Sequence, residues 1–175
     1  MSPAITIAQL GAEVLRLQAH RVDDFDCDKF QTLIDTLQHA MQEGNGVGIA
    51  APQIGESLQV VIIASRPTPR YPQAPEMAPI VMVNPEYQII DDTVDKDWEG
   101  CLSIPGIRAR VPRFRAVRVV YQDRHGEHQA LDLQGFPARV FQHEYDHLIG
   151  KVYLDRVETN QDIIAESEFL KRLAA

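Results

Sequence analysis

The sequence GFPARVFQHEYDHLIG, residues 135–150, predicts one short helix at the centre of the fold. Glycine and proline stand where such a helix begins, and Gly150 stands where it ends. Phe141, Tyr145 and Leu148 form an apolar stripe along it. We therefore expect this helix to be buried on several sides.

Two histidines of this helix are spaced to bind one metal ion. His143 and His147 lie about 40° apart around the helix axis and one turn apart along it. Glu144, beside the first histidine, is left free to move a proton. A divalent ion in such a site lowers the pKa of a bound water from about 15.7 to about 7. Histidines four residues apart are also common without a metal, so a third ligand is required.

Cys101 is the candidate for the third ligand, in the segment WEGCLSIPG at residues 98–106. One thiolate and two imidazoles leave a fourth position open, which is typical of a catalytic rather than a structural site. The alternative is that Cys101 is a small buried apolar residue. Cys27 lacks any surrounding ligand pattern and is expected to be such a residue or to lie at the surface. Two cysteines are too few for a disulfide framework.

A third segment, GVGIAAPQ at residues 46–53, also has the composition of a site. Its two glycines let the backbone approach a substrate closely, and Gln53 offers an amide donor. Alone it is also compatible with an ordinary turn. It lacks the preceding strand and following helix of a dinucleotide or phosphate loop.

The remaining pattern predicts an α+β fold, with a mainly antiparallel sheet or sheets packed around the metal-binding helix and with a C-terminal helix. Residues 1–175 are expected to form a single domain. The arginines between residues 108 and 118 are expected to be solvated strand residues. We predict helices at about 12–18, at 26–43 and at 161–173 with Asn160 as cap, and strands at 58–64, 80–84, 86–91, 116–123 and 128–134, the last two joined by a turn at 125–127.

Composition and charge narrow the class of protein. A formal net charge of −8 argues against direct nucleic-acid binding, which depends on basic side chains. No apolar run approaches the ~18 residues of a membrane-spanning helix, so no membrane partner is expected. The first residues do not have the pattern of a secretory signal, and the cytoplasm is the expected location.

Taken together, the segments at 46–53, 99–103 and 142–150 resemble the three signature motifs of the peptide deformylase family, in the family's order and approximate separation. The resemblance extends over nearly the whole chain. It implies a metal-dependent amidohydrolase that removes the N-formyl group from the N-formylmethionine of nascent polypeptides and releases formate, a step of co-translational processing.

The resemblance also implies a role for each motif residue. Cys101, His143 and His147 would hold one divalent metal ion, with Fe²⁺ expected and Zn²⁺, Ni²⁺ or Co²⁺ as substitutes. Glu144 would be the general acid and base. The side chain of Gln53 and the backbone N–H of Leu102 would stabilise the oxyanion.

A substrate site follows from the same resemblance. Arg108 would meet the peptide backbone beyond methionine. Glu99 is placed at the substrate site, with the alternative that it pairs with Arg113 as structural support. Asp146 would orient a ligand imidazole or be a solvated helix acid. The other residues expected at the substrate are Val47, Gly48, Gly100, Phe136, Val140 and His143.

Three alternatives stay open at this point. The helix motif alone fits a zinc endopeptidase, although a cysteine ligand upstream of the helix argues against that class. A non-catalytic domain stabilised by a closed metal site would leave Glu144 and Gln53 without a purpose. A degenerate deformylase is disfavoured because every signature position is intact.

The partners implied by the resemblance are N-formylmethionyl nascent peptides and, transiently, the ribosome. In some family members a basic C-terminal helix docks on the ribosome. Here the acids Asp162, Glu166 and Glu168 are offset only by Lys171 and Arg172, so another surface is expected to mediate any contact.

Overall fold

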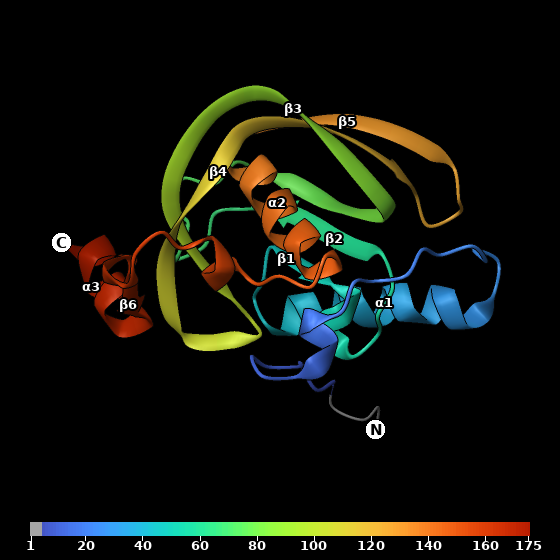
Figure 1. The fold of residues 1–175 in the computed structure, drawn as a ribbon, viewed down its shortest axis with the longest axis horizontal. Helices are drawn as coiled ribbons and strands as arrows, with labels where there is room; N and C mark the ends of the chain where they lie inside the picture. The colour runs from blue at the N-terminus through green and yellow to red at the C-terminus, as the bar shows by residue number, and fades with distance from the viewer. Residues whose placement is uncertain (1–4) are drawn as a thin grey trace.

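Six strands form one antiparallel sheet in the computed structural model, which describes residues 5–175 (Figure 1). The strands β1 to β5 follow one another in both sequence and space, and β6 pairs with β4. This confirms the predicted α+β class. The elements are η1 Glu13–Arg16, α1 Asp28–Glu43, β1 Gly48–Ala50, η2 Ala51–Ile54, β2 Val60–Ser65, β3 Met77–Cys101, β4 Ile104–Gln122, β5 His128–Gln134, α2 Phe136–Leu148, η3 Tyr153–Arg156, η4 Asn160–Asp162, β6 Ile163–Ala165 and α3 Glu166–Ala174.

The strand β2 is buried on both faces because a helix covers each of them. Val61 and Ile63 point into the cluster that contains α2, whereas Val60 and Ile62 point into the cluster that contains α1. Alternate side chains of a strand lie on opposite faces, so one apolar run serves both clusters. Figure 1 shows α1 and α2 on opposite sides of β1 and β2.

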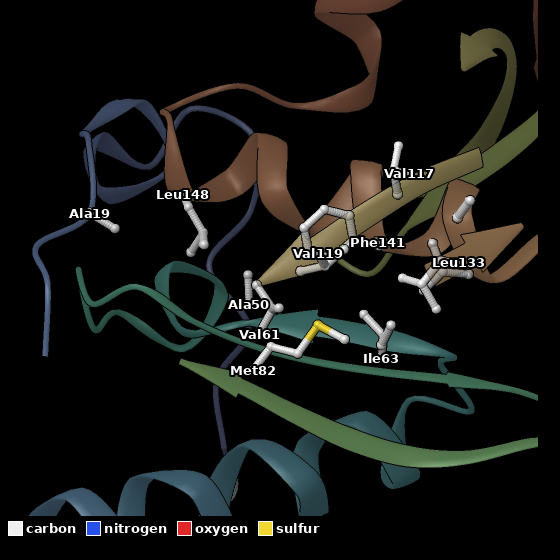
Figure 2. Packing of buried hydrophobic residues seen from close by; sticks show 12 residues of the cluster. Ala19, Ala50, Val61, Ile63, Met82, Val117, Val119, Leu133, Phe141 and Leu148 are labelled. Carbon is white, nitrogen blue, oxygen red and sulfur yellow. The ribbon is translucent and has the colours of Figure 1, made fainter. Parts of the chain in front are cut away.

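The helix α2 lies inside the curve of the sheet, with β3, β4 and β5 bending around it (Figure 1). Phe141 and Leu148 of α2 pack against residues of β1, β2 and β4, as Figure 2 shows. The helix is therefore buried along most of its length, and ten of its thirteen residues are buried. This confirms the central helix that the sequence predicts.

The strands β3 and β4 form one hairpin that is much longer than predicted. The sequence indicates strands only at 80–84, 86–91 and 116–123, yet pairing continues to Cys101 and resumes at Ile104. The extra part of β3 is acidic and largely exposed, so it lacks the apolar alternation that marks a half-buried strand. Ion pairs between the two strands support its pairing instead. The Arg115 Nη2, for example, lies 2.9 Å from the Asp95 Oδ1.

The end of the chain differs from the helix predicted at 161–173. Residues 163–165 pair with residues 107–109 of β4, and α3 begins only at Glu166. The cap of the short turn η4 is Thr159, whose side chain accepts from the N–H of Gln161, and not Asn160. The β-branched pair Ile163 and Ile164 favours the edge of the sheet over a helical turn.

Three smaller expectations are also resolved. The helix predicted at 12–18 is a single 3₁₀ turn, Glu13–Arg16, whereas α1 lies close to its predicted bounds. The turn at residues 125–127 joins β4 to β5 as expected, with Gly126 at φ 84°. Among the described residues, every helix is too short or too polar to cross a membrane.

Candidate active site

The helix α2 carries both predicted histidines and the glutamate, and it places His143 and Glu144 on the wall of one cavity. Gly135 precedes the helix at φ 63°, a conformation that suits glycine, and Pro137 stands in its first turn. His143, Glu144 and His147 are all buried, with 7%, 5% and 0% of their surface exposed.

Cys101 completes a group of three ligand atoms. It ends β3, just before the turn at Leu102 and Ser103 that reverses the chain into β4. The ligand atoms of Cys101, His143 and His147 all lie within 4.8 Å of one another. The sheet and the central helix therefore each contribute to one potential metal site.

The donor set and its spacing fit a divalent transition metal. The Cys101 Sγ lies 3.5 Å from the His147 Nε2, and two such donors around a tetrahedral ion lie about 3.5 Å apart. Burial would raise the pKa of the Cys101 thiol, but His147 and His143 beside it lower that pKa well below its usual value. These neighbours therefore favour the thiolate, which is the form in which cysteine binds a metal.

The ligand His143 is fixed by a carboxylate behind it. Its Nδ1 lies 2.8 Å from the Glu99 Oε1, which leaves the Nε2 free for an ion. The Nδ1 of His147 is buried and has no hydrogen-bond partner within residues 5–175. Of these two histidines, therefore, only His143 has its Nδ1 held by a carboxylate of residues 5–175.

Glu99 is the centre of a buried ion-pair network. Arg113 donates to both carboxylate oxygens at 2.9 and 3.0 Å, and Arg139 donates to Oε2 at 2.8 Å. Burial alone would raise the pKa of Glu99, but Arg113 and His143 hold it well below its usual range. The predicted pairing of Glu99 with Arg113 is confirmed, and Glu99 still borders the cavity.

Asp146 does not orient a candidate ligand imidazole, and both predictions for it are wrong. It is 2% exposed and so is not a solvated helix acid either. Its carboxylate accepts from Arg113 at 2.6 Å and from Arg156 at 2.7 Å. Arg113 thus bridges Glu99 of β3 and Asp146 of α2, and it indirectly supports the His143 position.

Glu144 lies against the glycine segment. A β-carbon at Gly48 would collide with the Glu144 carboxylate, so glycine is required for this close approach. The Oε2 of Glu144 is buried, and no hydrogen-bond donor of the described residues reaches it. Burial raises the pKa of Glu144 to about 7, although His143 and His147 oppose that rise. Such a carboxyl group is suited to exchange a proton near neutral pH.

Gln53 directs its amide group at the same centre. Its Oε1 accepts from the N–H of Ala50 at 2.9 Å, which fixes the orientation of the amide. Its Nε2 donates to the Ser103 Oγ at 3.1 Å and to the Cys101 Sγ at 3.4 Å. A rigid, buried N–H donor therefore lies beside the potential metal site, and Leu102 lines the same cavity.

The residues predicted for substrate all border one cavity of about 590 Å³. Cys101, His143 and Glu144 lie on its wall, together with Gln53 and Leu102. The expected substrate residues on the same wall are Val47, Gly48, Glu99, Gly100, Arg108, Phe136 and Val140.

Arg108 is held differently from the prediction of a solvated strand residue. It is 5% exposed, donates to the hydroxyl oxygen of Tyr71 at 2.9 Å and pairs with Glu166 at 2.9 Å. A β-carbon at Gly100 would collide with its guanidinium group. Arg113 is also buried, whereas Arg110, on the same strand, is exposed. The arginine-rich stretch therefore alternates between buried and solvated positions.

Sequence reasoning missed Tyr71 and Glu166, which also line the cavity. The Tyr71 ring packs on Phe136 with centroids 4.7 Å apart, and burial raises the pKa of its phenol. Neither residue lies in a recognisable motif, because both reach the cavity through long-range packing. Tyr71 lies in the proline-rich loop between β2 and β3, residues 66–76, and Glu166 begins the C-terminal helix α3; neither segment gave a local signal.

Comparison with known proteins agrees with this geometry. Residues 4–162 match the family model described as polypeptide deformylase. Peptide deformylase 2 of Nostoc sp. is 48% identical over 170 residues, covering 97% of this chain and 95% of the relative. Peptide deformylase 2 of Shewanella oneidensis is 43% identical over 164 residues, covering 94% of this chain and 90% of the relative.

Solved structures show the same fold. A Met-Ala-Ser-bound class I type b peptide deformylase from Acinetobacter baumannii superimposes with a TM-score of 0.86 at 44% identity, over 90% of this chain and all of that one. An actinonin-bound peptide deformylase from Synechococcus elongatus gives 0.81 at 35% identity, over 99% of this chain and 87% of that one. The chain has one cysteine and two histidines gathered as potential metal ligands with a glutamate beside them, and it belongs to the polypeptide deformylase family.

Proposed function

We propose that this chain hydrolyses the formamide bond of N-formylmethionine at the start of newly made polypeptides and releases formate. The observation that carries this proposal is the buried Glu144 carboxylate beside three ligand atoms. Its Oε2 accepts no hydrogen bond from residues 5–175, and it borders the cavity that reaches Cys101. A base with a pKa of about 7 at that place is suited to take a proton from water.

The protein side chains divide the work of the reaction between them. Glu144 accepts the proton of the attacking water and then delivers it to the departing amine nitrogen, so that a free N-terminus results. The amide N–H of Gln53 and the backbone N–H of Leu102 stabilise the negative charge that develops on the formyl oxygen. One such donor contributes about 3 kcal/mol to lowering the barrier.

Cys101, His143 and His147 would hold the divalent ion. When bound, the ion supplies Lewis-acid polarisation and lowers the pKa of water. We propose Fe²⁺ as the cellular metal, with Zn²⁺, Ni²⁺ or Co²⁺ as substitutes, because imidazole and thiolate ligands suit these ions. Glu99 fixes the His143 tautomer by accepting from its Nδ1.

The methionine side chain is proposed to enter an apolar part of the cavity. Val47, Phe136 and Val140 supply aliphatic and aromatic surface there, next to His143. Tyr71 adds to this wall because its ring packs on Phe136. The glycines at 48 and 100 keep the backbone free of side chains where Glu144 and Arg108 pack against it.

Formate release from formyl-Met-Ala-Ser by anaerobically purified, iron-loaded protein tests the proposal. Cleavage of casein is measured in parallel, because a zinc endopeptidase would hydrolyse its internal peptide bonds. Formate release without casein cleavage supports deformylation. Cleavage of casein with no formate release would instead support the endopeptidase.

The proposed substrates place the protein where polypeptides are made, so we propose the cytoplasm and a transient encounter with the ribosome. The C-terminal helix α3 carries Glu166 and Glu168 in its first turn, and Glu166 is engaged by Arg108. A ribosome contact through another surface is therefore proposed. The net charge of −8 opposes direct nucleic-acid binding.

A further inference from the structure

The part of the active-site cavity formed by the proline-rich loop and the C-terminal helix is rich in arginine. Arg66 and Arg70 come from the loop between β2 and β3, and Arg108 comes from β4. Glu166, the first residue of α3, lines the same part of the cavity and pairs with Arg70 and Arg108. We call these four residues the arginine rim.

The acid of the arginine rim is shared between two arginines. The Glu166 Oε1 lies 3.0 Å from the Arg70 Nε and 2.9 Å from the Arg108 Nη2. Arg66 is exposed and has no carboxylate oxygen within 4.0 Å among residues 5–175. The arginine rim thus contains three guanidinium groups and one carboxylate, which gives it a net positive charge.

The other acids of the cavity do not compensate this charge. Glu99 is occupied by Arg113, Arg139 and His143. Glu144 packs against Gly48, beside the candidate metal ligands. The arginine rim therefore offers an unsatisfied attraction to a carboxylate that arrives with the substrate.

From this geometry we infer that the arginine rim makes the enzyme prefer substrates with an acidic side chain within the first few residues after the formylmethionine. Arg66 and Arg70 are the residues that determine this preference. The side chain of Arg70 is 38% exposed, so a peptide can reach it without any movement of the loop. The inference rests on the proposed deformylase function and adds a substrate preference to it.

The whole-molecule charge predicts the opposite preference. A net charge of −8 repels acidic peptides and attracts basic ones at long range. A preference for acidic substrates would therefore have to arise locally, at the arginine rim. A measured preference for acidic peptides would therefore point to the arginine rim, and a preference for basic peptides would point to the net charge.

The test compares C-terminally amidated formyl peptides that carry Asp or Asn at the second, third or fourth residue. The amide removes the terminal carboxylate, and matching free acids are assayed in parallel to separate that source of charge. The readout is the Asp/Asn ratio of kcat/KM within each protein variant. For at least one position we expect a ratio of about three at low ionic strength, decreasing towards one in ~0.5 M salt.

The double variant R66A/R70A should lose most of this ratio, whereas the control Arg118→Ala should keep it. Arg118 is exposed and pairs with Asp132 on the outer strands, so it changes net charge without touching the cavity. Calorimetry is then done with the deformylated, amidated peptides that carry Asp or Asn at the position with the highest kinetic ratio, and the Asp peptide should bind more tightly than the Asn peptide.

Several results would overturn the inference. These are ratios of one or less at every position, a ratio that survives in R66A/R70A, an equal loss in Arg118→Ala, or an advantage confined to free-acid peptides. Formate release from the Asn peptides without any Asp preference would reject the inference and leave the proposed function standing. No formate from any peptide by well-folded, metal-loaded protein would reject both.

Discussion

The Glu99 Oε1 lies 2.8 Å from the Nδ1 of His143, so a strand residue fixes the orientation of a helix residue at the candidate metal site. Glu99 also accepts from Arg113, which donates in turn to Asp146 of α2. The sheet and the central helix are therefore joined by a buried network of opposite charges directly behind the ligand.

We predict that Glu99→Gln weakens metal binding about 10- to 100-fold, because the substitution disturbs the carboxylate that orients His143. It should also destabilise the protein by about 3 kcal/mol, since Arg139 would lose its buried carboxylate partner and Arg113 would keep only Asp146. Chelator competition and thermal unfolding measure the two effects. The exposed control Asp132→Asn should change neither appreciably, and wild-type metal affinity in Glu99→Gln would refute this role.

Gly48→Ala is predicted to lower kcat at least ~10-fold while metal content is retained. The new methyl group would collide with the Glu144 carboxylate and displace the proposed base, without touching a ligand atom. At Gly46 an added β-carbon meets its nearest neighbours at 3.4 to 3.5 Å, so Gly46→Ala should lose much less activity. Equal kinetics for the two variants would show that the close approach to Glu144 is unimportant.

The central helix and the burial of its two candidate ligand histidines were predictable because their signal is local. Glycine, proline, the apolar stripe and the histidine spacing lie within residues 135–150, and α2 forms there. Cys101 and Gln53 were also identified, since each lies in a compact motif. The structure then brings all three segments to one cavity.

The long acidic half of β3 and the β6 strand were not predictable in the same way. Both strands form because they pair with β4, and the residue pattern within a single segment gives no information about such a long-range contact. Tyr71 reaches the cavity through its contacts with Arg108 and Phe136. Glu166 does so through its pairing with Arg70 and Arg108, so both residues required the folded structure.

Metal exchange should change the response to oxygen. Ferrous iron is oxidised more readily than nickel, and the Cys101 thiolate is the proposed ligand next to it, so we predict that iron-loaded protein loses activity in air and nickel-loaded protein keeps it. Parallel kcat measurements under air and under argon provide the test. Equal losses with both metals would mean that oxidation of the iron does not cause the inactivation.

The Glu166 ion pairs should contribute a pH-dependent part of stability. Hydrogen bonds from Arg108, and the charges of Arg108 and Arg70, lower the Glu166 pKa below its ordinary value of 4.5. The folded protein therefore binds this proton less readily than the unfolded chain. The stabilisation should be complete above pH ~4.5 and decline as the pH falls through the folded-state pKa.

Thermal unfolding of wild type and Glu166→Gln between pH 7 and pH 3 measures this contribution. The Tm of the wild type should exceed that of the variant at neutral pH, and the difference should shrink below pH ~4.5. A difference that grows on acidification would have the wrong sign for a carboxylate stabilised by arginines.

The most direct test of the proposed reaction is formate release from formyl-Met-Ala-Ser by wild type and Glu144→Ala, with bound metal quantified in both. Glu144 is not one of the three ligands, so the variant should retain its metal. The account predicts rapid release by the wild type and near-total loss in the metal-loaded variant. Comparable release by both proteins, or none by metal-loaded wild type, would contradict it.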